Sequence, residues 1–174
     1  LGTGSVARFR NPNGIVLVGT MLTVCDASDE RMRFVDTTNG DALLVRTGTG
    51  SAGFDDGPAG SATFSGPRGL ALDSSNNVFV ADKSNNAIRK IDTSDVTTTI
   101  AGTGGVTGSS DNAIGILATF NRPEGVAVDS NGYVFVADSG NAKVRLVSPT
   151  GVVSSFALAS LSEPVGISTD SDGK

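Results

Sequence analysis

The sequence predicts an all-β fold, a β-propeller of four-stranded blades, and three observations support this prediction. A pattern of an apolar residue, two further residues, a proline, any residue and a glycine occurs four times, with its prolines at Pro12, Pro67, Pro123 and Pro164. Each occurrence precedes short runs of β-branched residues separated by turn residues. No stretch sustains the apolar spacing of an amphipathic helix.

The spacing of these prolines gives the size of the repeated unit. The steps are 55 (12 to 67), 56 (67 to 123) and 41 (123 to 164) residues, so a unit of about 41 residues carries insertions in two copies. That length fits a four-stranded propeller blade. We expect a single propeller domain over 1–174, with about three blades plus partial ones, placed approximately at 9–50, 64–104 and 120–160, with partial blades at 1–8 and 161–174.

The third copy shows the strands of a blade most clearly. An apolar run at 125–129 is followed by Asn131-Gly132, a strong hairpin signal, and by a second run, Tyr133 to Asp138. Further turn residues separate it from the two remaining runs. The strands of this blade are therefore expected at 125–129, 133–138, 143–147 and 152–156.

The other two copies repeat this arrangement with different fidelity. The second copy has Val78-Phe-Val-Ala-Asp82 and Asn85 in the same positions. The first is more divergent, because 16–18 lacks a following aspartate and Cys25 replaces the alanine of the other copies. This lone cysteine is expected to be a small buried apolar residue.

Several short patterns resemble NHL repeats: Pro-x-Gly-(Val/Leu)-Ala-(Val/Leu)-Asp, Val-Phe-Val-Ala-Asp-x-x-Asn, and (Ile/Val)-Arg. The resemblance covers essentially the whole chain. It implies a propeller that is usually six-bladed. A six-bladed ring needs roughly 250 residues at this repeat length. NHL propellers serve as binding platforms in some proteins and as enzymes in others, so the fold alone does not decide the function.

Composition restricts the partners and the compartment. The net charge is −5 and the sequence pI is about 4.6, with no Trp and one Tyr among 174 residues. Binding to phosphates requires clustered Lys and Arg, so nucleic acid is not an expected partner. No apolar run is long enough to span a membrane. A surface rich in Gly, Ser and Thr favours an extracellular or cell-surface location.

The residue inside each Pro-x-Gly is the main candidate for binding. In a propeller, the links between blades and the turns between the second and third strands lie on one face, the top face, where ligands usually bind. The residues at this position differ while the surrounding scaffold repeats, as expected of a specific surface on a repeat fold. They are Asn13, Arg68, Glu124 and Val165.

Recurring acids, amides and arginines are expected to be structural. A short carboxylate or amide at a turn accepts backbone N–H groups, and this explains the repeat better than a metal site does. The arginines are expected to reach between blades to carbonyls or carboxylates. The acids and amides are Asp26, Asp29, Asp82, Asn85, Asp138 and Asn141, and the arginines are Arg33, Arg89 and Arg145.

The two insertions, 48–62 and 104–118, are expected to cover the top face. Their apolar residues Phe54, Ile114 and Leu117 should then pack against neighbouring blades or a partner. Adjacent polar residues at 55–57 and 109–112 are interpreted as solvated loop, with weak calcium binding as the alternative.

The chain contains no histidine, the commonest general acid–base group and zinc ligand. We therefore expect a non-catalytic module without a cofactor, binding a protein or glycan within a larger protein. The alternative is a calcium-dependent hydrolase or lyase, for which Glu124 and Asn13 would be the nearest ligands. We also expect the ring to be completed by the rest of a longer chain, or otherwise by a second copy.

Overall fold

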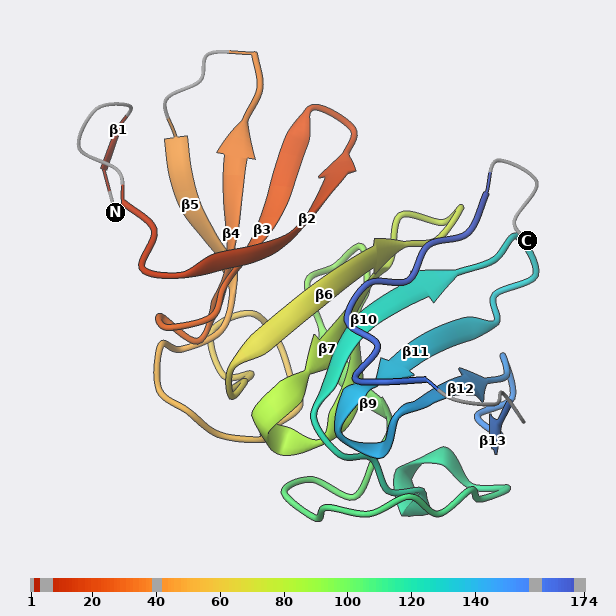
Figure 1. The fold of residues 1–174 in the computed structure, drawn as a ribbon. Helices are drawn as coiled ribbons and strands as arrows, with labels where there is room; N and C mark the ends of the chain where they lie inside the picture. The colour runs from red at the N-terminus through yellow and green to blue at the C-terminus, as the bar shows by residue number, and fades with distance from the viewer. Residues whose placement is uncertain (1, 4–7, 39–41, 157–160, 171–174) are drawn as a thin grey trace.

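The computed structural model describes residues 2–3, 8–38, 42–156 and 161–170. These residues form β-strands and short 3-10 turns, without an α-helix (Figure 1). In the same described ranges, no helix is long and apolar enough to cross a membrane.

The strands form three antiparallel sheets, one for each repeat, which we call blades one to three. Blade one contains β2 (Pro12–Val18), β3 (Met21–Asp26), β4 (Arg31–Asp36) and β5 (Ala42–Thr47). Blade two contains β6 (Pro67–Leu72), β7 (Val78–Asp82), β8 (Ala87–Ile91) and β9 (Thr97–Ala101). Blade three contains β10 (Pro123–Val128), β11 (Val134–Asp138), β12 (Lys143–Val147) and β13 (Val153–Ser155).

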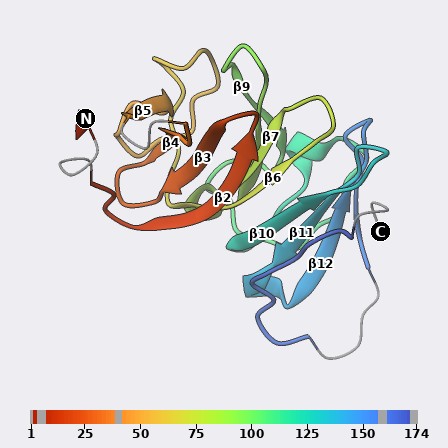
Figure 2. The ribbon, with the colours of Figure 1, turned by 90° about the horizontal axis from the view of Figure 1, so that it is seen from above.

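Each blade is a simple meander in which every strand pairs with the next along the chain. The short turns η2 (Lys83–Asn85) and η4 (Ser139–Asn141) connect the second and third strands of blades two and three. The blades follow one another around an arc, with β2, β6 and β10 on its inner side (Figure 2). The predicted all-β propeller architecture is thus confirmed.

The core lies between the blades. One buried cluster joins blade one to blade two and includes Cys25 and Met32 from β3 and β4. A second joins blade two to blade three and includes Ala71 and Phe79. All five residues of β7 are buried, because its side chains alternate between these two interfaces.

The two faces of β2 differ in burial. Val16 packs against the cluster shared with blade two. Ile15 and Leu17 occupy the opposite face and are 56% and 53% exposed. This difference follows from strand geometry, because successive side chains of a strand point to opposite faces.

The glycine of each Pro-x-Gly lets the inner strands approach one another. A Cβ on Gly14 would lie 2.4 Å from the carbonyl oxygen of Arg68, and one on Gly69 would lie 2.6 Å from that of Glu124. The same contact recurs between Gly125 and the carbonyl of Val165. Glycine is needed here for close backbone contact.

The insertions attach to the outer edges of the blades that follow them. Gly57 forms an antiparallel bridge with Thr97 of β9, and Asn112 forms the same bridge with Val153 of β13. Both loops lie at the end of the sheets where β6 and β10 begin, the lower side of Figure 1. They therefore cover edge strands, which limits pairing with other chains.

Two terminal segments differ from the expected partial blades. Gly2–Thr3, expected in a partial blade at 1–8, form β1 and pair with the outer edge of β5. Residues 161–170, expected in a partial blade at 161–174, have no assigned strand. This segment still lies beside β10, because the Thr169 hydroxyl donates to the carbonyl of Val128 at 3.2 Å.

Candidate functional site

The four candidate residues from the Pro-x-Gly positions come together in one cavity. Its volume is about 380 Å³, and we call it the inner-strand hollow. The starts of β2, β6 and β10 and the segment 165–167 form its wall, and the lining includes Asn13, Arg68, Glu124 and Val165. The inner strands bring these side chains together because each blade presents the same position to the arc's centre.

Arg68 is the cation that lines the hollow. Its Nη1 donates to Oδ1 of Asn13 at 2.6 Å, across the boundary between blades one and two. The Asn13 amide in turn donates to the carbonyl of Asn11 at 2.9 Å. No acidic group lies within 4.0 Å of Arg68 among the described residues. Several of its N–H donors therefore remain available to a ligand.

Glu124 is held by cations instead. Its Oε1 lies 2.7 Å from Nζ of Lys83 and 3.9 Å from Nη2 of Arg122, and its side chain is only 16% exposed. The sequence interpretation did not identify Lys83 as a neighbour of the hollow. Lys83 lies between the second and third strands of blade two, and the turns at this point belong to the top face. This position could have indicated that Lys83 lies near the hollow.

The insertions lie at the same end of the sheets as the hollow, but none of their residues lines it. Ile114 and Leu117 are 56% and 52% exposed, so neighbouring blades leave about half of each side chain uncovered, and packing against a partner stays a prediction. Phe54 is half-buried, with the guanidinium carbon of Arg89 4.9 Å from its ring centre. The bridges to β9 and β13 direct both loops outward.

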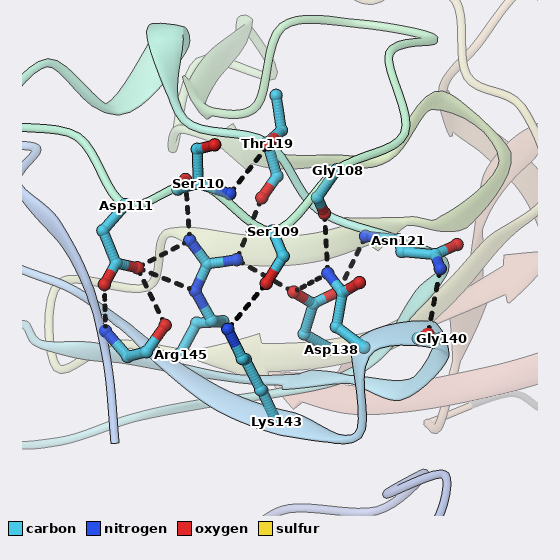
Figure 3. A network of polar contacts seen from close by, with 12 residues as sticks. Gly108, Ser109, Ser110, Asp111, Thr119, Asn121, Asp138, Gly140, Lys143 and Arg145 are labelled. Atoms are coloured by element: carbon cyan, nitrogen blue, oxygen red, sulfur yellow. Dashed lines mark hydrogen bonds and ion pairs between the residues drawn. The ribbon is translucent and has the colours of Figure 1, made fainter. Parts of the chain in front are cut away.

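Each blade contains a buried arginine, and the one in blade three shows the arrangement in full (Figure 3). Arg145 is completely buried, and its Nη1 donates to Oδ2 of Asp138 at 2.9 Å. Its Nη2 donates to Oδ1 of Asp111 at 2.8 Å and to the carbonyl of Ser110. Arg89 makes equivalent bonds to Asp82 and Asp56. The arginines thus reach carbonyls and carboxylates as predicted, but these groups belong to the same blade or to the insertion before it, and not to a neighbouring blade.

Blade one obtains its second carboxylate from a different place. Arg33 contacts Asp29 through Nη2 and lies 3.6 Å from Oδ2 of Asp26. In the other two blades the residue matching Asp29 is an asparagine, Asn85 or Asn141, and the second acid comes from the insertion. The presence of Asp29 where the other blades have asparagine could have indicated this local source of the second carboxylate.

The repeated aspartates accept hydrogen bonds from backbone N–H groups that are distant in the sequence, and not only from their own turn. Oδ1 of Asp82 accepts the backbone N–H of Ser65, and Oδ1 of Asp138 accepts that of Asn121, each 17 residues earlier. The Asp26 Oδ1 accepts the N–H of Arg10 and Asn11 in the same manner. These bonds fix the start of each inner strand, and so position the hollow.

The acids of the insertions are already engaged by protein groups. Oδ2 of Asp56 accepts the N–H of Thr99 at 2.9 Å, and Oδ2 of Asp111 accepts that of Ser155 at 3.0 Å. Both side chains nevertheless remain partly solvated, at 46% exposed for Asp56 and 45% for Asp111. No group of three or more Asp, Glu, Cys or His side chains suited to a metal occurs in the part of the chain that the structure describes.

Cys25 is fully buried, with its Sγ 3.5 Å from Sδ of Met32. Burial raises the pKa of its thiol well above the usual value. A thiol in this state is a poor nucleophile. The expectation of a small buried apolar residue is confirmed.

Comparisons with known proteins agree with this architecture. The NHL repeat family matches residues 64–91 and 120–145, which lie in blades two and three. Protein SUPPRESSOR OF QUENCHING 1 of Arabidopsis thaliana is 26% identical over 155 residues, covering 83% of this chain. The chain spans only 14% of the length of that relative.

Two solved structures illustrate the range of similar folds. An auxiliary nutrient binding protein from Bacteroides thetaiotaomicron has a TM-score of 0.68 at 22% identity, covering 81% of this chain and 36% of its own. Virginiamycin B lyase from Staphylococcus aureus has a TM-score of 0.62 at 15% identity, covering 91% and 45% respectively. At these identities the similarity concerns the fold. Residues 64–91 and 120–145 of this chain thus match NHL repeats, and its three sheets have the arrangement of β-propeller blades.

Proposed function

We propose that this protein is a non-catalytic binding module whose inner-strand hollow recognises an acidic group on a protein or glycan. The observation that supports it is Arg68, a cation in the hollow whose one described hydrogen-bond partner is the neutral amide of Asn13. Arginine presents several N–H donors in a plane that matches a carboxylate. Arginines of this kind are enriched where proteins bind partners.

The rest of the hollow is consistent with recognition rather than catalysis. Glu124 is paired with Lys83, so its carboxylate is neutralised rather than poised as a base. Asn13 uses its amide oxygen for Arg68. The calcium-dependent hydrolase or lyase is the less favoured proposal, since its two nearest ligands already have protein partners. We propose that the module needs no cofactor.

The biological context of this module is also a proposal. The similar nutrient binding protein supports a binding role, and the low Lys content supports an extracellular or cell-surface location. The exposed faces at Ile15 and Leu17 resemble the buried inter-blade faces. We propose that further blades cover them, from the rest of the same chain or from a second copy.

A binding screen with one variant tests the role of Arg68. The protein is immobilised and exposed to an array of acidic and neutral glycans and to acidic and basic peptides. We expect the retained ligands to be acidic, and Arg68→Ala to weaken their binding about tenfold, as loss of a charge-assisted hydrogen bond would. Arg8→Ala is the matched control, because Arg8 is exposed and does not line the hollow.

The same screen can contradict the proposal. Equal losses in Arg68→Ala and Arg8→Ala would indicate a general charge effect instead of a site. A preference for neutral or basic ligands would exclude recognition of an acidic group. Calcium-dependent hydrolysis of lactones that is lost in Glu124→Gln would support the enzyme instead.

A further inference from the structure

A second cavity lies between blades two and three, at the opposite end of the sheets from the inner-strand hollow. Its volume is about 410 Å³, and we call it the inter-blade cleft. Its apolar wall is formed by Phe79 and Ile100 of blade two and by Val134 and Val147 of blade three. The hairpin residues Asp73 and Gly132 place it beside the β6–β7 and β10–β11 connections, which lie toward the upper right of Figure 1. The cleft is thus a largely apolar recess between blades two and three.

Lys90 is the cation of this cleft. It lies on β8 directly opposite Phe79 of β7, and its Nζ is 5.9 Å from the centre of the Phe79 ring. No carboxylate of the described residues lies within 4.0 Å of this ammonium group. A half-buried lysine without an acidic partner attracts an anion more strongly than a solvated lysine does.

Asp73 is the acid that lines the cleft, and its own turn occupies both of its oxygens. Oδ1 accepts the N–H of Ser75 and of Asn77, and Oδ2 accepts the Asn77 side-chain amide at 2.7 Å. The carboxylate is thus directed to the β6–β7 hairpin. Among the described residues, these bonds direct Asp73 away from Lys90, whose ammonium group has no described hydrogen bond to them.

The repeat shows that Lys90 departs from the pattern of its position. The residue directly after the buried arginine is Phe34 in blade one and Leu146 in blade three. Both are apolar, as expected for a side chain that faces the next blade. An inter-blade face does not require a lysine, so packing does not account for Lys90. On a repeated frame, a departure of this kind is where a specific site arises.

We propose that the inter-blade cleft binds a small molecule with an apolar body and a single carboxylate. The apolar body would pack against Phe79, Ile100 and Val147, and the carboxylate would meet Nζ of Lys90. The hydroxyls of Ser148 and Thr150 lie 2.9 Å apart at the rim, and since one donates to the other, a single O–H is left as a further donor. The volume is within the range of small-molecule sites. One lysine matches one negative charge, which favours a carboxylate over a phosphate.

The test is an NMR titration of the chain with 4-phenylbutyrate and, separately, with its neutral amide. We expect the acid to shift the backbone amide signals of Ile100, Thr150 and Gly151, and to bind about tenfold more tightly than the amide. Lys90→Leu, which installs the residue of blade three, should retain the fold and remove the difference between the two compounds. Lys143→Leu is the matched control, because that lysine lies on β12 outside the cleft.

The outcomes distinguish this site from the inner-strand hollow, on which it does not depend. Shifts confined to Gly69 and Gly125 would place the acid in the hollow and overturn the proposal. Equal affinity for acid and amide, or an equal loss in Lys143→Leu and Lys90→Leu, would also overturn it. Absence of shifts with either compound at millimolar concentration would do the same. Lys90→Gln provides a second variant with a polar side chain, and it should likewise lose the preference for the acid.

Discussion

Nη1 of Arg89 donates to Oδ2 of Asp82 at 2.8 Å, and both side chains are completely buried. The other oxygen of Asp82 accepts the backbone N–H of Ser65, immediately before the Gly66-Pro67 step that begins the inner strand. One buried pair therefore ties the third strand of a blade to the start of its first. Since that start carries Arg68, the pair also positions the inner-strand hollow.

Removing one partner of this pair should destabilise the fold strongly. Asp82→Ala leaves the guanidinium of Arg89 buried with one carboxylate fewer, and we expect the free energy of unfolding to fall by about 3–5 kcal/mol. Asp56→Ala removes the second carboxylate that contacts Arg89. Because the Asp56 side chain is 46% exposed, we expect this change to lower the free energy of unfolding by only about 1 kcal/mol. Urea unfolding followed by circular dichroism measures both values. A smaller cost for Asp82→Ala than for Asp56→Ala would contradict the assignment.

The close approach of inner strands predicts a steric cost at Gly69. A methyl group there would lie 2.6 Å from the carbonyl oxygen of Glu124 and 2.9 Å from Cα of Gly125. We expect Gly69→Ala to lower the free energy of unfolding by about 1–3 kcal/mol. Gly60→Ala is the control, because a Cβ there meets no atom within 4 Å. If the two variants unfold at the same temperature, the inner strands do not pack as described.

A hydrogen bond between blades can be tested at Asn86. Its Oδ1 accepts the backbone N–H of Arg122 at 2.8 Å, which connects blade two to the start of blade three. Asn86 has a φ of 52°, and Ala142 has the same value at the matching position of blade three. Alanine therefore fits this backbone, and Asn86→Ala should report mainly the lost hydrogen bonds of its side chain, about 1–2 kcal/mol. Hydrogen exchange at the Arg122 amide should accelerate, and unchanged protection there would argue against the bond.

Acid should weaken blade one through Asp29. Burial alone would raise the pKa of this carboxyl, but the hydrogen bond from Arg31 and the charge of Arg33 outweigh burial and hold the pKa below its usual value of 3.8. The ionised carboxylate of Asp29 thus stabilises the folded state at pH values above 3.8. This stabilisation is lost as the pH falls through the lowered pKa. Asp29→Asn, which installs the residue of the other two blades, should reduce the loss of stability on acidification.

The measurement for Asp29 compares unfolding midpoints of the two proteins in urea at neutral pH and near pH 3. The midpoint of the unmodified protein should fall more between these conditions than that of Asp29→Asn. Ser28→Ala, an exposed neighbouring change, should behave as the unmodified protein does. Parallel pH profiles in Asp29→Asn and the unmodified protein would show that the Asp29 pKa is not lowered.

The strands and the hollow could be predicted from sequence because their signals are local. The hairpin at Asn131-Gly132 and the Pro-x-Gly repeats are contained within a few residues, and strand geometry follows from them. The gathering of Asn13, Arg68 and Glu124 followed from the same repeat, since equivalent positions of successive blades must face the same axis.

The sequence by itself determined the all-β fold, the size of the blade and the residues that line the hollow. Tertiary structure alone decided the path of the insertions, the exposure of Ile114 and Leu117, and the partners of the buried arginines. The physical reason is distance along the chain: Asp111 meets Arg145 34 residues away and Ser155 44 residues away. Such pairs form only when the blades pack and exclude water, because burial then makes each unpaired charge costly.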